Sequence, residues 1–200
     1  MTLYCVKPAF QALLRPLMFC LAKKQITANQ VTLAAMVLSF LTGGLLLLFP
    51  NPELFWLLPV VLFIRMALNA LDGMLARECH QKTRLGALLN EFGDVLSDIA
   101  LYLPFILLPG SCPQLVLSML FFTVFSEFAG VLAQAINGVR SYAGPMGKSD
   151  RALVFGALGL ALSGWPELIA WSNVAWGIVT LLLIWTIINR CRSVLPGNHP

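Results

Sequence analysis

The amino-acid sequence predicts an all-α, polytopic membrane protein with six transmembrane helices and a preceding amphipathic helix on the membrane surface. Of its 200 residues, 58% are hydrophobic and only 11% are charged, whereas a soluble domain of this size carries about 25% charged residues. The apolar residues gather in six stretches, and nearly all lysines and arginines lie on one side of them. No linker or change of composition divides the chain, so we expect residues 1–200 to form a single domain.

Residues 1–26 are expected to form the surface helix. Apolar residues such as Leu13 and Leu17 alternate there with Arg15, and the segment ends in Lys23 and Lys24. This mixture suits a helix with its apolar side in the acyl chains and its cations at the lipid phosphates. Because Arg15 interrupts the apolar run and no small-residue cleavage site follows, we do not expect a removable signal peptide.

Six further stretches are apolar enough for transmembrane helices, which need about 20 residues to cross the hydrocarbon core. The fifth of these stretches is the shortest. They cover residues 31–49, 54–76, 85–108, 114–137, 148–163 and 168–189.

The distribution of cations predicts the orientation of these spans, because short cytoplasmic loops hold an excess of lysine and arginine. Of the 13 lysines and arginines, only Arg65 lies inside a span. The loops near residues 51–53, 110–113 and 164–167 contain none, which places both termini in the cytoplasm. The remaining cations fall on the side of the termini: Lys7, Arg15, Lys23, Lys24, Arg77, Lys82, Arg84, Arg140, Lys148, Arg151, Arg190 and Arg192.

Polar residues concentrate on the second and third predicted spans, where an ionisable group is costly and therefore indicates a functional site. Asn69 and Asp72 are three residues apart, and Asn90, Asp94 and Asp98 follow one another at intervals of four. These spacings place each set on one face of its helix. Two neighbouring antiparallel helices can therefore direct these oxygen atoms toward one another.

This oxygen-rich pattern has two interpretations. Hard cations such as Mg²⁺ bind to a few carboxylates together with substrate phosphates, and the cluster offers such ligands. Alternatively, the polar groups join two helices without any metal, because buried polar side chains also hold membrane helices together.

The order of these residues resembles the signature of the CDP-alcohol phosphatidyltransferase family, D-x-x-D-G-x-x-A-R, eight residues, G, three residues, D, three residues, D. Two shorter motifs add to the resemblance, Ala28-Asn29-x-x-Thr32 before the first span and Gly147-Lys148 before the fifth. In this chain the signature reads Asn69-Ala-Leu-Asp72-Gly73-Met-Leu-Ala76-Arg77, then Gly86, Asn90 and Asp94 at the same spacing.

The resemblance implies an enzyme that transfers a phosphatidyl group from CDP-diacylglycerol to a small alcohol and releases CMP, in phospholipid biosynthesis. It also implies a homodimer in the inner membrane of a bacterium, with its active site at the cytoplasmic face. Its partners would be the two substrates and membrane lipid, with no nucleic acid, and its cofactor Mg²⁺ or Mn²⁺.

The family pattern further implies roles for individual residues. The metal would be held by Asn69, Asp72, Asn90 and Asp94, and Asp94 would also be the general base that takes the proton of the acceptor hydroxyl. The nucleotide would be bound by Asn29, Asp72, Gly73, Ala76, Arg77 and Gly86.

Two residues depart from the family pattern. Asn69 and Asn90 stand where the signature has aspartates, so the formal charge of the four-ligand set falls from −4 to −2. An amide oxygen still binds a hard cation, and Glu91 and Asp98 are further candidates that could restore the lost charge. The strength of metal binding and the number of metals are therefore open, as is a pseudoenzyme that binds a CDP-lipid without turning it over.

A second polar group surrounds the predicted cytoplasmic loop between the fourth and fifth spans. Arg140, Lys148 and Arg151 are candidates for binding a phosphorylated acceptor. Glycerol 3-phosphate, which would give phosphatidylglycerophosphate, is the favoured acceptor, with inositol phosphate or serine as alternatives. The same cations could instead serve only the positive-inside bias.

Two charges inside the membrane remain, Arg65 and Glu127. They could pair with each other, or Arg65 could contact a lipid phosphate. A transporter or channel is disfavoured, because the polar residues gather at the cytoplasmic end of the spans and no broken helices or inverted repeat are visible.

Overall fold

A computed structural model describes residues 7–195, and residues 1–6 and 196–200 of the predicted domain lie outside this range. Throughout this range the regular secondary structure is helical. Three 3-10 helices, η2 (Pro52–Trp56), η3 (Leu103–Leu107) and η4 (Pro166–Trp171), join successive α-helices. The α-helices are α1 (Lys7–Lys23), α2 (Ala28–Leu48), α3 (Leu57–Glu78), α4 (Arg84–Tyr102), α5 (Pro113–Asn137), α6 (Lys148–Gly164) and α7 (Ser172–Arg192).

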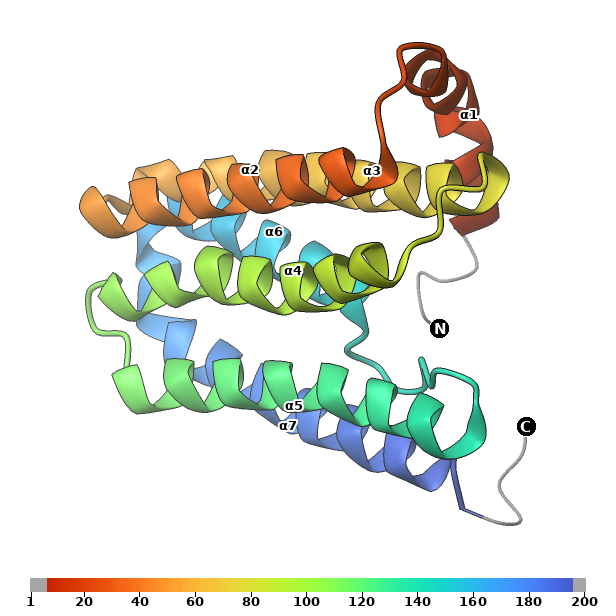
Figure 1. Cartoon of the computed structure of the whole chain (residues 1–200). Coiled ribbons are helices and arrows are strands. Elements are labelled where there is room, and N and C mark those ends of the chain that lie inside the picture. Colours follow the sequence, from red (N-terminus) through yellow and green to blue (C-terminus); the bar gives the residue numbers. More distant parts are fainter. Residues whose placement is uncertain (1–6, 196–200) are drawn as a thin grey trace.

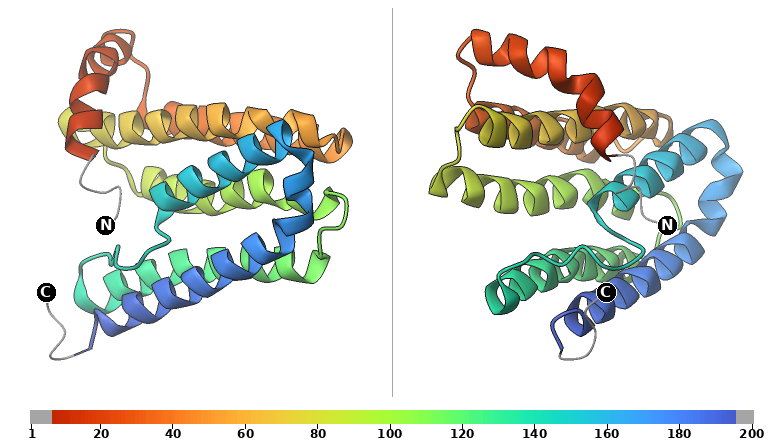
Figure 2. Two further views of the ribbon diagram at one scale, coloured as in Figure 1. Left: turned by 180° about the vertical axis from the view of Figure 1, so that it is seen from behind. Right: turned by 90° about the vertical axis from the view of Figure 1, so that its right-hand side faces the viewer.

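The helices α2 to α7 form an up-and-down bundle (Figure 1). Helix α2 packs on α3 and α4, α3 packs on α6, and α5 pairs with α7. The α5–α7 pair lies side by side below the other four helices in both views from the side (Figures 1 and 2). The start of α2, the end of α3, the start of α4 and the end of α7 lie at the same end of the bundle (Figure 1).

The prediction of an all-helical membrane protein is confirmed, and the prediction of six spans is met in part. By length and composition, four helical segments in residues 7–195 could cross a membrane, namely Ala28–Leu48, Pro52–Glu78, Pro113–Asn137 and Pro166–Arg192. The other two helices of the bundle are less suited to a lipid environment. Helix α4 carries Glu91, Asp94 and Asp98, and α6 has only 17 residues.

The third predicted span is interrupted near its far end. Residues 85–108 were expected to be one helix, but α4 ends at Tyr102 and η3 continues the chain. Pro104 explains this change, because it has no backbone N–H to donate and its ring crowds the preceding turn of an α-helix. The 3-10 helices η2 and η4 also begin with proline.

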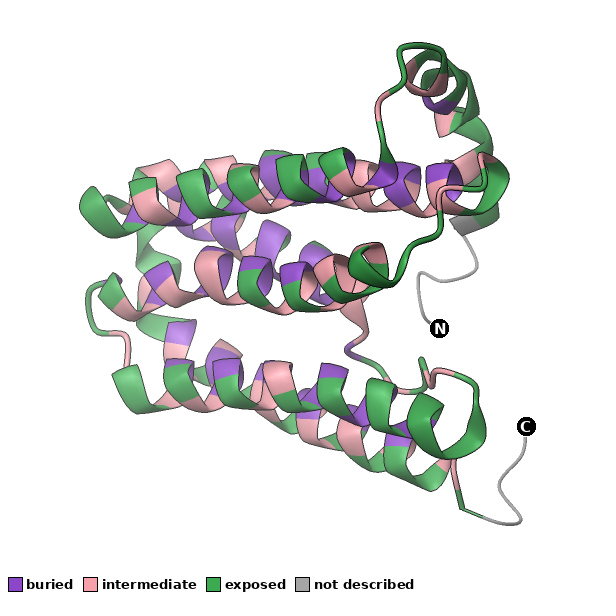
Figure 3. Cartoon of the chain, in the orientation of Figure 1, coloured by how far each residue is buried: buried purple, intermediate pink, exposed green. Residues whose placement is uncertain are grey.

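Apolar and aromatic side chains fill the centre of the bundle. We call the end at which α2 and α4 begin and α3 and α7 end the polar end. The Tyr102 and Phe155 rings stack with centroids 3.8 Å apart, and the Phe105 and Trp176 centroids are 4.8 Å apart. Outward faces of the helices are exposed (Figure 3) and carry large apolar side chains such as Leu41, which is 69% exposed. Such a surface is suited to contact with lipid.

Helix α1 crosses the outside of α3 at the polar end of the bundle (Figures 1 and 2). Its buried Met18 belongs to a small apolar cluster with Leu71 and Leu75 of α3. Arg15 also forms an ion pair of 3.1 Å with Glu78. The opposite side of α1 exposes Leu13, in agreement with an amphipathic surface helix.

Candidate active site

A pocket of about 540 Å³ opens at the polar end of the bundle. All six helices of the bundle, α2 to α7, contribute to its wall together with the loops before α4 and α6. The lining residues are Ala28, Asn29, Thr32, Asn69, Asp72, Gly73, Ala76, Arg77, Gln81, Lys82, Thr83, Gly86, Ala87, Asn90, Asp94, Glu127, Arg140, Tyr142, Lys148 and Arg190. The chemistry of this pocket therefore combines carboxylates and amides with several cations.

Local capping fixes the start of α2 beside the pocket. Thr27 and Gln30 form a capping box, in which the Gln30 side chain accepts from the Thr27 N–H at 2.9 Å and the Thr27 hydroxyl accepts from Gln30. The Gln81 side chain accepts from the Ala28 N–H at 2.8 Å. This last bond holds the loop between α3 and α4 against the beginning of α2.

Gly86 lies where the start of α4 approaches α2. The Gly86 N–H donates to the Thr83 side chain at 2.8 Å, which caps α4. A Cβ atom at this position would lie 2.6 Å from Asn29 Oδ1 and 2.9 Å from Thr83 Oγ1. The position therefore has no room for a larger side chain unless Asn29 moves within the pocket.

The predicted metal ligands lie together on α3 and α4. Asn69, Asp72, Asn90 and Asp94 all line the pocket. Asn69 Nδ2 donates to Asp94 Oδ1 at 3.4 Å, and the Thr32 hydroxyl donates to Asp72 Oδ2 at 2.8 Å. The facing arrangement inferred from the helical spacing is thus present in the structure.

This set of oxygen atoms fits a divalent cation that is bound together with a phosphate ligand. Mg²⁺ and Mn²⁺ are commonly held by one or two carboxylates and substrate oxygens, and Asp72 and Asp94 provide two carboxylates. Within residues 7–195 no group of three or more His, Cys, Asp or Glu side chains is suited to holding a metal ion. Two of the four predicted ligands, Asn69 and Asn90, are amides and not carboxylates.

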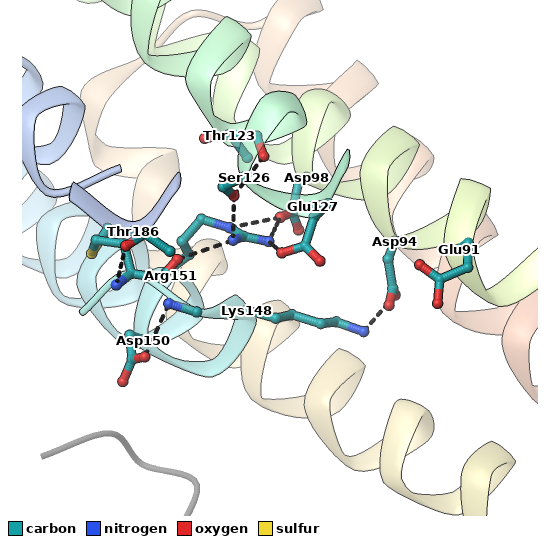
Figure 4. Close-up of polar contacts among 12 residues, drawn as sticks. Glu91, Asp94, Asp98, Thr123, Ser126, Glu127, Lys148, Asp150, Arg151 and Thr186 are labelled. Carbon is teal, nitrogen blue, oxygen red and sulfur yellow. Dashed lines mark hydrogen bonds and ion pairs between the residues drawn. The ribbon is translucent and has the colours of Figure 1, made fainter. Parts of the chain in front are cut away.

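Cations line the opposite wall of the pocket. Lys148, the first residue of α6, forms an ion pair with Asp94 Oδ1 (Figure 4). Arg140 forms ion pairs with Glu91 and with Glu127, the latter at 2.7 Å.

The loop that carries Arg140 is anchored on α7. The Met146 N–H donates to the Thr186 hydroxyl at 3.0 Å. Gly144 has φ +114° and lies so close to α7 that a Cβ atom would be 2.6 Å from Thr186 Cα. Only glycine readily adopts this backbone conformation at such a close approach.

A chain of buried ion pairs continues from the pocket into the bundle. Arg65 donates to the Asp94 backbone carbonyl at 2.9 Å and to Asp98 at 2.5 Å. Arg151 lies between Asp98 and Glu127 and donates to each at 2.8 Å, as Figure 4 shows. The chain links α3, α4, α5 and α6, and Arg190 of α7 joins it with a nitrogen 3.6 Å from Glu127.

Not every predicted site residue reaches the pocket. Asp98, expected as an additional metal ligand, is 1% exposed and is bonded to Arg65 and Arg151 away from the pocket wall. Arg151, expected to bind the acceptor, is equally buried and faces the same carboxylates. Glu91 directs its carboxylate to Arg140 rather than toward Asp72 or Asp94.

Of the two possibilities considered for Arg65, the pair with Glu127 does not form. Arg65 is bonded to Asp98, and Glu127 contacts Arg140, Arg151 and Arg190. The remaining predicted positions, from Asn29 and Gly73 to Ala76, Arg77 and Gly86, all line the pocket.

Arg190 is the main pocket residue that the sequence analysis missed, since it was counted only as a cytoplasmic cation. It is 2% exposed, and its Nη1 donates to the Ser126 carbonyl. Its helical phase is the signal that could have revealed it. The buried residues of α7, among them Leu183, Thr186 and Arg190, recur at alternating intervals of three and four.

An all-helical membrane bundle with an oxygen-rich, cation-lined pocket at one end defines the class of protein. The chain belongs to the CDP-alcohol phosphatidyltransferase family, which it matches over residues 25–188.

Two curated proteins illustrate this relationship. The inner membrane protein YnbA of Escherichia coli K12 is 67% identical over 195 residues, which cover 98% of this chain and 97% of that protein. The phosphatidylinositol phosphate synthase of Mycolicibacterium smegmatis is 30% identical over 196 residues, covering 94% and 86% respectively.

Solved structures share the fold. A crystal structure of Mycobacterium tuberculosis phosphatidylinositol phosphate synthase with CDP-DAG bound matches with a TM-score of 0.72 and 20% identity, covering 92% of this chain and 96% of that one. A structure of the same enzyme with manganese and citrate has a TM-score of 0.72 and 23% identity, covering 92% and 91%. At these identities the likeness concerns the fold.

Proposed function

We propose that this protein transfers a phosphatidyl group from CDP-diacylglycerol to a phosphorylated small alcohol, with release of CMP. One observation carries the proposal: a single pocket brings the signature residues Asn69, Asp72, Asn90 and Asp94 opposite a wall that contains Arg140 and Lys148. The diphosphate of a CDP-lipid would contact these four signature residues. Its nucleoside would occupy the adjacent part of the pocket, which Gly73 and Gly86 line. The related synthase of M. smegmatis supports phosphatidyl transfer as the reaction class.

The donor would bind with its cytidine beside α2 and the start of α4. Asn29, Gly73, Ala76 and Gly86 line this part of the pocket, and Arg77 is the cation nearest to them in sequence. Small residues allow a planar base to approach the helix backbones, and a guanidinium pairs well with a phosphate. The acyl chains would remain in the membrane beside the exposed apolar faces of the helices.

In the reaction, the acceptor hydroxyl oxygen attacks the phosphorus that carries diacylglycerol. A new P–O bond forms, the P–O bond to CMP breaks, and CMP leaves with that electron pair. Asp94 takes the hydroxyl proton, a role that requires a carboxylate within hydrogen-bond reach of the acceptor. A divalent cation, held by Asp72 with the neighbouring amides of Asn69 and Asn90, would neutralise charge on the diphosphate oxygens.

The acceptor is proposed to carry a phosphate because of two buried guanidinium nitrogen atoms. Nε of Arg140 and Nε of Arg190 are both buried, and neither has a hydrogen-bond partner in the structure. Such donors are costly unless an acceptor atom satisfies them, and phosphate oxygens suit arginine. Glycerol 3-phosphate and inositol phosphate both meet this requirement, and serine does not.

The surroundings of the protein are part of the proposal. We propose a homodimer in a bacterial inner membrane with six spans, cytoplasmic termini and the pocket at the cytoplasmic face. The relative YnbA is named an inner membrane protein, and the end of α7 lies at the same end of the bundle as the pocket.

The test uses purified protein in detergent with radiolabelled CDP-diacylglycerol, Mg²⁺ or Mn²⁺, and glycerol 3-phosphate, inositol phosphate or serine. We expect CMP release that depends on a phosphorylated acceptor. Asp94→Asn should abolish the release while the protein remains folded, and Glu53→Gln, an exposed carboxylate on the far side, is the matched control. An Asp94→Asn variant with full activity would overturn the assignment of the base.

The alternative function is a pseudoenzyme that binds a CDP-lipid without turning it over, and Asn69 and Asn90 are the observation that favours it. A pseudoenzyme would bind CDP-diacylglycerol and release no CMP with any acceptor. Recovery of CMP release in an Asn69→Asp, Asn90→Asp double variant would then show that the amides are responsible for the loss.

A further inference from the structure

The carboxylate of Asp94 is already surrounded by nitrogen donors from the chain itself. Lys148 pairs with its Oδ1, as Figure 4 shows, and Asn69 Nδ2 donates to the same oxygen at 3.4 Å. Arg65 Nη2 lies 3.7 Å from this oxygen. An aspartate at position 69 could not donate in this way, and its negative charge would instead require a cation between the two carboxylates.

Asp72 has different surroundings in the same pocket. Its Oδ2 accepts from the Thr32 hydroxyl at 2.8 Å. Among residues 7–195, no lysine or arginine nitrogen approaches its carboxylate within 4.0 Å, whereas Asp94 has two such neighbours. Asp72 is therefore the pocket carboxylate whose charge the protein leaves for a ligand to balance.

The formal charge of the site depends on positions 69 and 90. The connected ion pairs join five cations to four carboxylates, Asp72 is a fifth carboxylate, and Arg77 and Lys82 are two further cations of the pocket wall. Aspartates at positions 69 and 90 would make this charge more negative by two. The cations are Arg65, Arg140, Lys148, Arg151 and Arg190, and the paired carboxylates are Glu91, Asp94, Asp98 and Glu127.

A bound diphosphate diester adds two negative charges to either version of the site. The version with Asn69 and Asn90 therefore carries two fewer negative charges than a version with aspartates at both positions. Two charges correspond to one divalent cation. Uncompensated charge is costly in a buried site. An acceptor phosphate would add the same charge whether positions 69 and 90 are asparagines or aspartates, so it does not change this comparison.

We propose that this site binds one divalent cation together with the diphosphate, at Asp72, and that Lys148 is a permanent counter-cation for Asp94. The proposal rests on the function proposed above, since it takes the diphosphate of a CDP-lipid as the ligand. Amide oxygens of Asn69 and Asn90 are the chain's further ligands for that cation. The amides at positions 69 and 90 and the Lys148–Asp94 ion pair thus act together, so that the site holds one divalent cation.

The number of bound cations tests this proposal without any turnover. Purified protein in detergent is titrated with Mn²⁺ in the presence of CDP-diacylglycerol and without an acceptor, and bound Mn²⁺ is counted by electron paramagnetic resonance. We expect one Mn²⁺ per chain and no spin coupling. The Asn69→Asp, Asn90→Asp double variant should bind two Mn²⁺ with the coupled spectrum of ions roughly 4 Å apart.

A matched pair of lysine variants tests the role of Lys148. Lys148→Met should free Asp94 and allow a second Mn²⁺ to bind, whereas Lys82→Met, at another lysine of the pocket wall, should still bind one. Two coupled ions or none in the unsubstituted protein would overturn the proposal, and so would a double variant that still binds one. The Mn²⁺ count is independent of CMP release, so failure of the proposed reaction would be recognised separately.

Discussion

Arg151 is the residue whose loss should most damage the stability of the bundle. Only 1% of its surface is exposed, and it donates hydrogen bonds to Asp98, Glu127, Ser126 and the Met146 carbonyl. These partners belong to α4, α5 and the loop before α6, so one guanidinium joins three parts of the chain. Methionine fills a similar volume without the charge, which makes Arg151→Met the informative substitution.

The structure bounds the size of this effect. Removing one partner of a buried ion pair costs roughly 3–5 kcal/mol, because the remaining charge is left uncompensated. Asp98 keeps its bond to Arg65, and Glu127 keeps Arg140 and Arg190. We therefore expect the lower limit, a loss of about 3 kcal/mol. For a chain of this length that corresponds to a fall in melting temperature of roughly 6–12 °C.

Thermal unfolding in detergent, followed by tryptophan fluorescence, measures the change. Arg84→Met is the matched control, because Arg84 is exposed at the first position of α4 and should change stability by less than about 0.5 kcal/mol. Equal melting of Arg151→Met and the unsubstituted protein would refute the role assigned to this network.

Two further substitutions test close contacts in the structure. Gly43→Ala should destabilise the protein by about 1–3 kcal/mol in the same melting assay, because its Cβ would lie 2.1 Å from the Ala100 carbonyl oxygen of α4. Gly44→Ala, with nothing within 4 Å of the added carbon, should not be destabilising, and equal losses for both would contradict the packing argument. Thr32→Val removes the hydroxyl that donates to Asp72 and should weaken Mn²⁺ binding roughly tenfold, measured by titration. Unchanged Mn²⁺ affinity would show that this hydrogen bond does not orient the carboxylate.

Helical spacing was sufficient to predict which polar residues of α3 and α4 lie together. The intervals of three and four residues depend only on the helix repeat, so Asp72 and Asp94 reach one pocket as expected. The same reasoning could not separate Asp94 from Asp98, which lies on the same face one turn further into the bundle. That difference depends on tertiary structure, since the side chains of Arg65 of α3 and Arg151 of α6 reach Asp98 at that level.

The sequence was less informative about the cations. Lys148 and Arg151 both lie in the first turn of α6, yet one reaches the pocket and the other turns into the bundle. Net charge and the positive-inside rule treat these two residues alike. Their different roles arise from tertiary packing, which also buries Arg190 while Arg192, two residues later, stays exposed.

Glu127 has a consequence for how this protein can change over evolutionary time. One carboxylate receives guanidinium groups from three separate parts of the chain, Arg140, Arg151 and Arg190. A single replacement of Glu127 by a neutral residue would leave three guanidinium groups close together, with Glu91 beside Arg140 and Asp98 beside Arg151 as the remaining carboxylates. We therefore expect viable sequences to alter this position only together with one or more of its arginines, as a group that varies in concert.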